Sequence, residues 1–455
     1  MRKLLCFSHV ERIVLSVGVL YLLQSIVFSN PTGMKSSGGF GVISLAGYTL
    51  VPSELTLALF YLIFLFLRFF RRGRVRSLRL WIGNGSLIIN VIVALIVFSC
   101  IQGLLNGNDQ FLSEFRVSIF SMGLFLLFLN LPLSLQSVRR IVRWWSVLGA
   151  FVAGWYILLF FAPNIKMILS ANSKSIGVGL PLSLVLFSIS TSMAMFIFGI
   201  QTRLNLMIFT ISVISVAIRI GSKDIVLAMI GVWISVVAAC FLRYGVRPGR
   251  YLALIGVIML IIVGGFGVLS SNLKAELMDT FSRRVLKLTN INTSNVMSLE
   301  MFLAAGSEKE GVDSGRFEIW RFYLGEAVRG YGLSRKGLGF DPVFRLSESD
   351  ILSKGKHNIF VYFSYEFGVL AGFLLVLIVA RGLFLYFCIP PPSGRTQQLY
   401  SYYAIEVGLF GFAFGMLLNS MVGLRVFFPT VAWFCWFSVV VVLRFREMLN
   451  DTLET

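Results

Sequence analysis

His357 stands where a long polar stretch of the chain becomes apolar, and its imidazole could serve as a general base. It is one of only two histidines, with Lys354 and Lys356 before it and Asn358 after it. A histidine near neutral pH can accept a proton from a hydroxyl group or hold a substrate oxygen. The alternative is an interfacial histidine without a chemical role, and one isolated histidine favours this simpler interpretation. The choice between a catalytic and a purely interfacial histidine therefore depends on the residues that accompany His357.

Helical spacing indicates which residues would accompany His357 if the following apolar segment is a helix. At 100° per residue, Ser364 and Gly368 fall on the face of His357, and Glu366 falls on the opposite face. A glycine at position 368 would let a neighbouring helix approach closely. Glu366 is therefore not expected to orient His357.

Two carboxylates, Glu366 and Glu406, lie well inside apolar segments. Such residues are costly in a membrane and are candidates for function. The alternative is a protonated or hydrogen-bonded carboxyl that joins helices, and for Glu366 both interpretations stay open. Glu406 precedes Gly408, Gly411 and Gly415, a spacing that predicts a close-packed helix face. Glu406 is therefore better interpreted as structural.

Four basic residues adjoin apolar or helical segments on the side of the chain that is assigned below to the outside. They are Arg219, Lys223, Arg316 and Arg425. A guanidinium group recognises a diphosphate by paired, charge-assisted hydrogen bonds. Each of them alone could instead bind a phospholipid headgroup or cap a helix, but that alternative is weaker for a set that converges on one face.

Several other kinds of site are excluded by the motifs that the sequence lacks. It contains no Walker motif, no HExxH and no GxSxG, and its five cysteines form no CxxC pair. The segment "GYGLSRKGLG" (330–339) is not a dinucleotide fingerprint, because no strand precedes it and no helix opens from it. We therefore expect no catalytic metal and no cofactor.

The elements that must position these residues are apolar segments long enough to cross a bilayer. The mean hydropathy is +0.85, with 57% hydrophobic and 13% charged residues. Continuous apolar runs of about 20 residues predict helices, since backbone groups cannot go unpaired in hydrocarbon. The predicted spans are 10–28, 54–70, 81–101, 114–132, 143–162, 177–199, 204–219, 224–242, 251–270, 358–380, 399–421 and 427–444. The expected fold is an all-α integral membrane protein with twelve transmembrane helices.

The distribution of basic residues predicts the orientation of these spans. Twelve spans place both termini on one side, which holds 20 of the 40 Lys and Arg residues and only four acidic residues. The short connections on the other side hold seven basic residues. The positive-inside rule therefore makes the first side cytoplasmic. Because most of the net charge of +19 then reflects topology, no nucleic-acid partner is expected.

One connection is far longer than the rest and divides the chain. The predicted parts are residues 1–270 with spans one to nine, a large loop at 271–356, and residues 357–455 with spans ten to twelve and a cytoplasmic tail. A connection of 86 residues is commonly functional. Within it, the pattern predicts a surface helix at 272–288, a second helix at 313–329 capped by Asp313 or Ser314, and a glycine-rich turn at 330–342. Phe317, Trp320, Leu324 and Val328 form an apolar stripe on the second helix.

Three motifs in this order resemble the O-antigen polymerase and O-antigen ligase superfamily. They are "SGRFEIW" (314–320), "GLGF" (337–340) and "HNIFVYFSYEFGVLAG" (357–372). Twelve spans with the large loop between the ninth and tenth are also similar to that family. Two positions depart from its pattern. Lys223 follows Ser222 where the family often has an arginine, so Arg219 or Lys223 would take that role, and Ala371 departs slightly from the ligase pattern.

The resemblance implies a bacterial membrane glycosyltransferase that acts at the periplasmic face of the inner membrane. The donor would be an oligosaccharide on undecaprenyl diphosphate, and an acceptor hydroxyl would displace the lipid diphosphate with inversion and without a metal. His357 and Arg316 would be the catalytic residues. The diphosphate would be bound by Arg219, Lys223, Arg316 and Arg425, and the substrate would be positioned by Trp320 and Asn358.

The acceptor and the class of protein leave alternatives open. A polymerase would use another lipid-linked oligosaccharide as acceptor, and a ligase would use the lipid A core; the imperfect ligase pattern slightly favours a polymerase. A chain-length regulator is a further candidate partner. A flippase for lipid-linked sugars would also have many helices and buried carboxylates, although no similar halves are evident. A purely structural partner in a polysaccharide assembly would leave the outer-face arginines unexplained.

Overall fold

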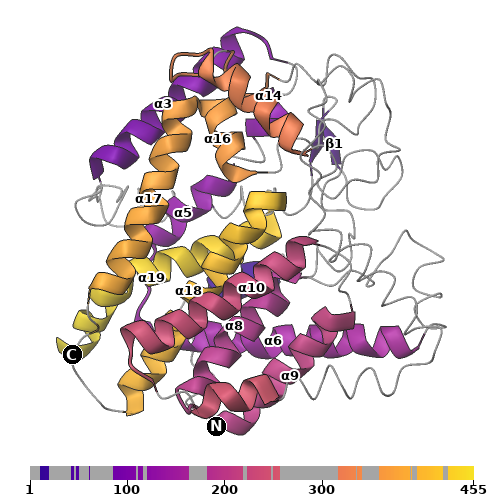
Figure 1. Cartoon of the computed structure of the whole chain (residues 1–455), viewed down its shortest axis with the longest axis vertical. Helices are drawn as coiled ribbons and strands as arrows, with labels where there is room; N and C mark the ends of the chain where they lie inside the picture. Colours follow the sequence, from indigo (N-terminus) through magenta and orange to yellow (C-terminus); the bar gives the residue numbers. More distant parts are fainter. Residues whose placement is uncertain are drawn as a thin grey trace, which may run out of the picture.

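The computed structural model describes most of the predicted membrane-embedded segments and part of the long loop. It describes residues 11–19, 43–45, 48–50, 61, 86–108, 111–115, 120–162, 182–218, 223–246, 249–256, 316–334, 336–340, 358–389, 391, 397–423 and 429–454. Within these ranges the chain is almost entirely helical (Figure 1). The exception is a small antiparallel hairpin in which β1 (Ile43–Leu45) pairs with β2 (Tyr48–Leu50). The all-α expectation did not include this hairpin, which lies in a connection between two predicted spans.

Apart from α14 (Arg316–Val328), which lies in the long loop, the described helices overlap the predicted apolar spans, although some ends differ by eight to ten residues. They are α3 (Ser86–Leu105), α4 (Phe111–Glu114), α5 (Phe120–Asn130), α6 (Leu135–Phe161), α8 (Leu182–Ile197), α9 (Thr202–Ile218), α10 (Lys223–Ala238) with the π-helical turn η3 (Ala239–Arg243), α14 (Arg316–Val328), α16 (Ile359–Phe367), α17 (Val369–Cys388), α18 (Gln397–Gly423) and α19 (Pro429–Glu454). The predicted surface helix at 272–288 and the cap residues Asp313 and Ser314 lie outside the described residues.

Four of the described helices are long and apolar enough to cross a membrane. These segments are Leu87–Leu105, Leu135–Phe161, Val369–Cys388 and Gln398–Met421. Three shorter apolar helices accompany them, at Leu182–Ile197, Thr202–Ile218 and Leu227–Arg243. Large apolar side chains point outward on the long helices, for example Leu105 on α3, Phe151 on α6 and Phe373 on α17. Such outward apolar faces suit contact with lipid, so we describe the chain as a membrane protein.

The tenth predicted span is broken, which corrects the expectation of one continuous helix over 358–380. Gly368 has φ +97°, a conformation that ends α16 and starts α17. The two helices then fold back on each other, because a Cβ atom built on Gly372 would lie 3.2 Å from the carbonyl oxygen of Phe360. In a continuous helix these two residues would be about 18 Å apart. α16 is therefore a buried half-helix of nine residues.

The centre of the helical assembly is α8, which α6 and α18 contact closely. Every residue of α8 from Ser183 to Ile197 is buried. Hydroxyl groups as well as aromatic side chains join the helices. The ring of Phe187 meets those of Trp145 on α6 and Phe412 on α18. Ser190 Oγ donates to the carbonyl of Gly408 at 2.6 Å. Between α6 and α8, the hydroxyls of Ser146 and Thr191 lie 2.7 Å apart. Small residues and side-chain hydrogen bonds are the usual means of joining helices in lipid.

The predicted close-packed face of α18 is confirmed. A Cβ atom on Gly408 would lie 2.7 Å from the Cα atom of Thr191. One on Gly415 would lie 2.7 Å from the carbonyl oxygen of Ala228 on α10, and one on Gly411 would collide with Val236. The three glycines therefore allow α8 and α10 to approach the backbone of α18.

A buried ion pair lies at the C-terminal end of α10, where η3 continues the helix. The guanidinium of Arg243 lies 3.2 Å from Glu406 Oε1, and both side chains are almost fully buried. Arg243 also donates to the carbonyl of Ile389 at 2.8 Å and stacks 4.4 Å from the ring centre of Tyr386, and Tyr244 donates to the other carboxylate oxygen of Glu406. These contacts join η3, α17 and α18. They support the structural interpretation of Glu406, because a buried charge needs such partners.

We expect Gly408→Ala and Gly382→Ala to have opposite effects on thermal stability. Gly382, on α17, has open space where a Cβ atom would lie, so alanine there gains helix propensity of about 1 kcal/mol. At Gly408 the methyl group forces α8 and α18 apart, at a cost of about 1–3 kcal/mol. Thermal unfolding in detergent, followed by size-exclusion chromatography, measures both. Equal midpoints for the two variants would contradict the packing described here.

Candidate functional site

Asn358, one of the residues that the sequence singled out, caps the start of the half-helix α16. The backbone of Asn358 is extended, and its Oδ1 atom accepts hydrogen bonds from the N–H groups of Phe360 at 2.9 Å and Val361 at 3.3 Å. Asparagine is among the best residues at this position, because it satisfies N–H groups that the first turn of a helix leaves unpaired. The cap therefore fixes where α16 begins and where the amide of Asn358 lies.

A hollow of about 470 Å³ lies between α14 and the first turns of α16. Its lining residues are Trp320, Arg321, Leu324, Asn358, Phe360, Val361 and Ser364. The walls are mostly apolar, with a few polar groups from Arg321, Asn358 and Ser364. An apolar hollow with a small number of placed polar groups is the common form of a ligand site. It lies at the end of the molecule where α14, α16 and α3 gather (Figure 1).

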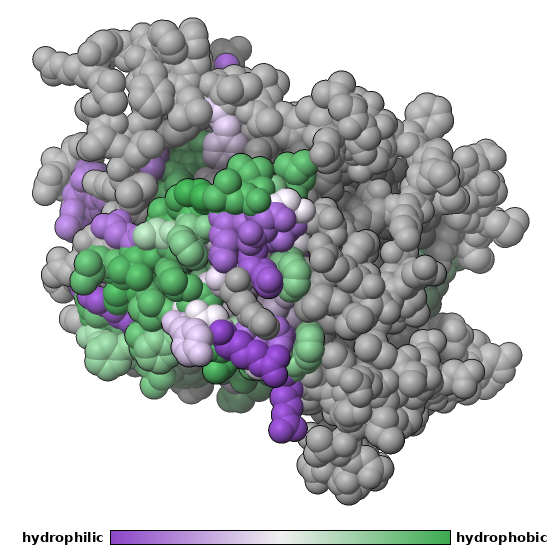
Figure 2. Space-filling model, turned by 90° about the horizontal axis from the view of Figure 1, so that it is seen from above, coloured by the Kyte–Doolittle hydropathy of each residue, from purple (hydrophilic) through white to green (hydrophobic). Residues whose placement is uncertain are grey.

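The surface at this end of the molecule is mixed in polarity. Seen from above, hydrophilic and hydrophobic residues alternate over short distances among the residues that the structure describes (Figure 2). Leu324 and Val328 are exposed on α14, and so are Tyr331 and Leu333 in the turn that follows it. Mixed polarity with exposed apolar side chains suits the boundary between a membrane and water.

An aromatic contact holds α14 against α16 on one side of the hollow. Tyr323, which is fully buried, meets Tyr365 edge to face, with ring centres 4.7 Å apart. Ala327 is buried one turn further along. The predicted helix is confirmed, but its predicted stripe is not the buried face: Leu324 and Val328 of that stripe are exposed. The buried face of α14 instead contains Tyr323 and Ala327, because α16 contacts α14 on the side of Tyr323.

The glycine-rich turn "GLGF" is held between α16 and the end of α3. The N–H group of Gly339 donates to Glu366 Oε2 at 2.9 Å, and the hydroxyl of Ser99 donates to the backbone carbonyl of Glu366. On α3, the carbonyl of Ser99 accepts from the N–H group of Leu338 at 3.0 Å. The side-chain amide of Asn108 donates to the carbonyls of Gly337 and Leu338 in the turn and of Lys336 just before it. Glu366, which is fully buried, therefore has a structural role in anchoring this turn.

Two glycines allow the turn after α14 to touch the break between α16 and α17. A Cβ atom on Gly368 would lie 2.6 Å from the carbonyl carbon of Leu333. The N–H group of Leu370 donates to the carbonyl of Gly332 at 3.2 Å. The prediction that a neighbouring helix packs against Gly368 is therefore wrong, because the backbone that approaches it is the turn at 332–333. This contact ties the end of α14 to the start of α17.

The structure brings two of the predicted site residues together. Trp320 and Asn358, which belong to different motifs, both line the hollow. Arg316 is the first residue of α14 and Lys223 the first residue of α10, but the structure describes neither side chain. His357, Arg219 and Arg425 lie outside the described residues.

Arg321 is the lining residue that the sequence did not single out. In the sequence it is one of many basic residues in the long loop. Only its position directly after Trp320 could have indicated that it belongs to the site. Its side chain is exposed and is the only charged one among the described residues that line the hollow. The polar residues that hold the turn, Ser99 and Asn108, lie in and just after the third predicted span and carried no sequence signal of a site.

The described part of the site can position a polar ligand. No cluster of three or more His, Cys, Asp or Glu side chains occurs among the described residues. A guanidinium group, an indole ring and a side-chain amide around one hollow can bind an anion and orient a sugar.

Comparisons with known proteins give no family for the chain. No family model matches it, and neither does any curated protein or solved structure.

Asn358→Asp and Asn358→Ala separate the capping role of this residue from any role in binding. Aspartate keeps an acceptor oxygen for the N–H groups of Phe360 and Val361, so we expect a thermal midpoint close to that of the original protein. Alanine removes the cap and costs about 1 kcal/mol. Thermal unfolding in detergent gives both values. The assignment of the cap is wrong if aspartate destabilises the protein as much as alanine.

Proposed function

We propose that the chain is a membrane glycosyltransferase that polymerises a bacterial surface polysaccharide. It would transfer an oligosaccharide from undecaprenyl diphosphate to a sugar hydroxyl of another lipid-linked oligosaccharide. The observation that carries the proposal is the hollow in which Trp320 and Asn358, from two separate motifs of the family resemblance, lie with Arg321. The anchored "GLGF" turn supports it further, because this remaining motif contacts the same half-helix through the hydrogen bond from Gly339 to Glu366.

The local geometry suits a ligand that carries both sugar and negative charge. Arg321 supplies a positive charge at the hollow, and the N-terminus of α16 adds the partial positive charge of a helix end. Oδ1 of Asn358 is occupied by the cap, which leaves its amide N–H groups to donate to a sugar oxygen. Trp320 offers an apolar ring face of the kind against which sugar rings pack.

The proposed reaction needs charge stabilisation and positioning more than it needs a cofactor. The acceptor hydroxyl oxygen attacks the anomeric carbon, the bond from that carbon to the diphosphate oxygen breaks, and the electron pair leaves with the lipid diphosphate. His357, which directly precedes Asn358 in the sequence, would take the hydroxyl proton. The leaving charge would be balanced by Arg316, Arg219, Lys223 and Arg425, with Arg321 as the addition from the structure. One displacement inverts the anomeric centre.

The proposed topology gives the side of the membrane on which the reaction would take place. Twelve transmembrane helices, cytoplasmic termini and a large loop at 271–356 would place this hollow at the periplasmic face of the inner membrane. There it would meet donor lipids of the outer leaflet. The surface around α14, with exposed Leu324, Val328 and Tyr331, is suited to that boundary.

A ligase that uses the lipid A core remains the alternative within the same family. A flippase is less well supported, because the two buried carboxylates that favoured a transporter have structural partners. Glu406 is paired with Arg243, and Glu366 holds Gly339. Carboxylates that carry ions in transporters must be able to change partners during the transport cycle.

The first test is the surface polysaccharide of a strain in which the gene is deleted. For a polymerase we expect single repeat units attached to their final anchor, because ligation continues while polymerisation stops. Gel electrophoresis of the extracted polysaccharide measures its length and its anchor. A complement that carries His357→Ala, present at normal levels in the membrane, should behave like the deletion.

The other outcomes of this test separate the alternatives. Long polymer that stays on undecaprenyl diphosphate would identify a ligase. Lipid-linked units confined to the cytoplasmic leaflet would identify a flippase, and a normal polysaccharide would reject all three assignments for that pathway.

Arg321→Gln tests the residue that the structure adds to the site. We expect glycosyl transfer to fall about 10- to 100-fold, since a charge-assisted hydrogen bond contributes about 1.5–3 kcal/mol. Arg329→Gln is the matched control, because Arg329 follows α14, is exposed and pairs with Glu326 away from the hollow. Transfer from purified donor lipid in vesicles measures both. Equal activity of the two variants would remove Arg321 from the site.

A further inference from the structure

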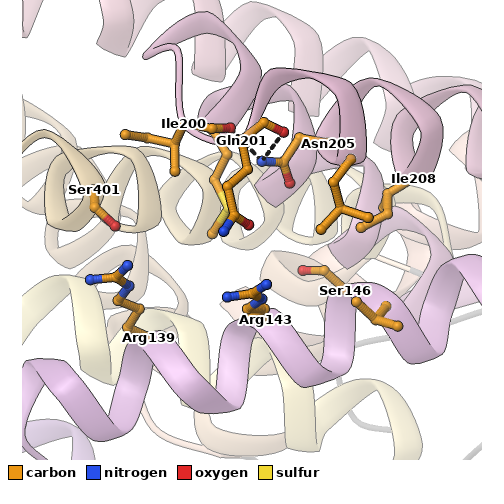
Figure 3. Close-up of a pocket in the computed structure, with 11 residues that line it drawn as sticks. Arg139, Arg143, Ser146, Ile200, Gln201, Asn205, Ile208 and Ser401 are labelled. Carbon is orange, nitrogen blue, oxygen red and sulfur yellow. Dashed lines mark hydrogen bonds between the residues drawn. The ribbon is translucent and has the colours of Figure 1, made fainter. Parts of the chain in front are cut away.

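A narrow pocket lies at the far end of the molecule from α14, between α6, the turn from α8 to α9, and α18 (Figure 3). Its lining residues are Arg139, Arg143, Ser146, Val147, Met195, Ile200, Gln201, Leu204, Asn205, Ile208 and Ser401. The space is about 20 Å³, room for little more than one water-sized group. A sugar ring or a nucleotide is too large for it, but a single oxygen of a phosphate group can enter.

Two arginines that form no ion pair with the residues that the structure describes line this pocket. Arg139 and Arg143 stand four residues apart on α6, so they share one face of the helix and repel each other. No carboxylate is among the lining residues, and the described residues form no ion pair with either guanidinium. Arg140, next in the sequence to Arg139, differs in that it pairs with Glu11 at 3.2 Å. The pocket thus concentrates positive charge that an anion would balance.

Polar groups of the other two elements face these arginines. In Figure 3 the guanidinium groups of Arg139 and Arg143 extend from α6 into the gap, with Ser401 and Gln201 across from them. Gln201 has φ +43°, and the turn that presents it is held by Asn205, whose side-chain amide donates to the carbonyl of Ile200 at 2.6 Å. A hydroxyl, an amide and two guanidinium groups are the donors that phosphate oxygens accept from.

The pocket lies at the level where α6 enters the apolar part of the molecule. Directly after Arg143, the side chains of Trp144, Val147 and Phe151 are exposed on α6. Tryptophan at the border of an exposed apolar helix face marks the headgroup level of a membrane, and arginine side chains there reach toward the headgroups. A phosphate at this level belongs to a lipid headgroup. Basic pockets between membrane helices on the cytoplasmic side are suited to anionic lipids.

We propose that this pocket binds the phosphate of an anionic phospholipid, with Arg139 and Arg143 as its ligands. Gln201 and Ser401 complete the contacts to the phosphate oxygens, and the acyl chains lie along Val147 and Phe151 of α6. The lipid joins α6 to the turn from α8 to α9 and to the start of α18. Its role is separate from the glycosyl transfer proposed above, because the two sites lie at opposite ends of the molecule.

The test compares thermal unfolding of the full chain in micelles that contain phosphatidylglycerol with unfolding in micelles that contain phosphatidylcholine. For the original protein we expect phosphatidylglycerol to raise the midpoint by about 3 °C or more, since a ligand of the folded state stabilises it. The double variant Arg139→Gln/Arg143→Gln should lose most of this shift. Arg381→Gln, an exposed arginine of α17 outside the pocket, is the matched control and should keep it.

Additional measurements distinguish a lipid phosphate from free inorganic phosphate. A shift produced equally by inorganic phosphate would overturn the lipid assignment in favour of a free anion. A shift that the double variant retains, or that Arg381→Gln loses as well, would show a general charge effect and overturn the site. Native mass spectrometry of the original protein needs no variant: we expect phosphatidylglycerol to be retained about tenfold over phosphatidylcholine. Equal retention of the two lipids would contradict the proposal.

Discussion

The backbone break at Gly368 is the constraint on which the candidate site depends. Because φ is +97° there, α16 stops after nine residues and α17 turns back alongside it instead of continuing in the direction of α16. The half-helix α16, which Asn358 caps at its start, is buried inside the helical assembly. The break also brings Gly368 against the turn at 332–333, so the end of α14 is fixed relative to α16.

The two ends of the molecule use buried polar groups for different purposes. Near α14, Glu366 and Asn108 hold an irregular turn whose backbone groups would otherwise be unpaired. Near η3, Arg243 and Glu406 hold three helical segments together by charge. In both places a buried carboxylate has a structural role: Glu366 holds a backbone N–H group, and Glu406 holds the side chains of Arg243 and Tyr244. The groups left for ligands are instead cations and amides at the surface of the molecule.

Apolar length predicted most of the helices, because a bilayer sets the same requirement on every span. The close contacts of Gly408, Gly411 and Gly415 were predictable for a related reason, since small residues at helical spacing have few other uses in lipid. The break at Gly368 was not, because a glycine inside an apolar run suits a packed helix and a broken one equally. The roles of Ser99 and Asn108 were not predictable either, because their hydrogen-bond partners are backbone groups far along the chain. Trp320 and Asn358 were predicted through their motifs and not through their contacts.

The buried pair of Arg243 and Glu406 has a consequence for how the protein is made. The two residues are separated by 163 positions, so the ribosome completes α10 and η3 long before α18 exists. During that interval Glu406, the ion-pair partner of Arg243 among the described residues, is not yet present. The contact surfaces of α8 and α10 that later receive Gly408 and Gly415 are also uncovered. Assembly of the first half is therefore completed only when the last helices are inserted, and quality control can act on chains that stop short of α18.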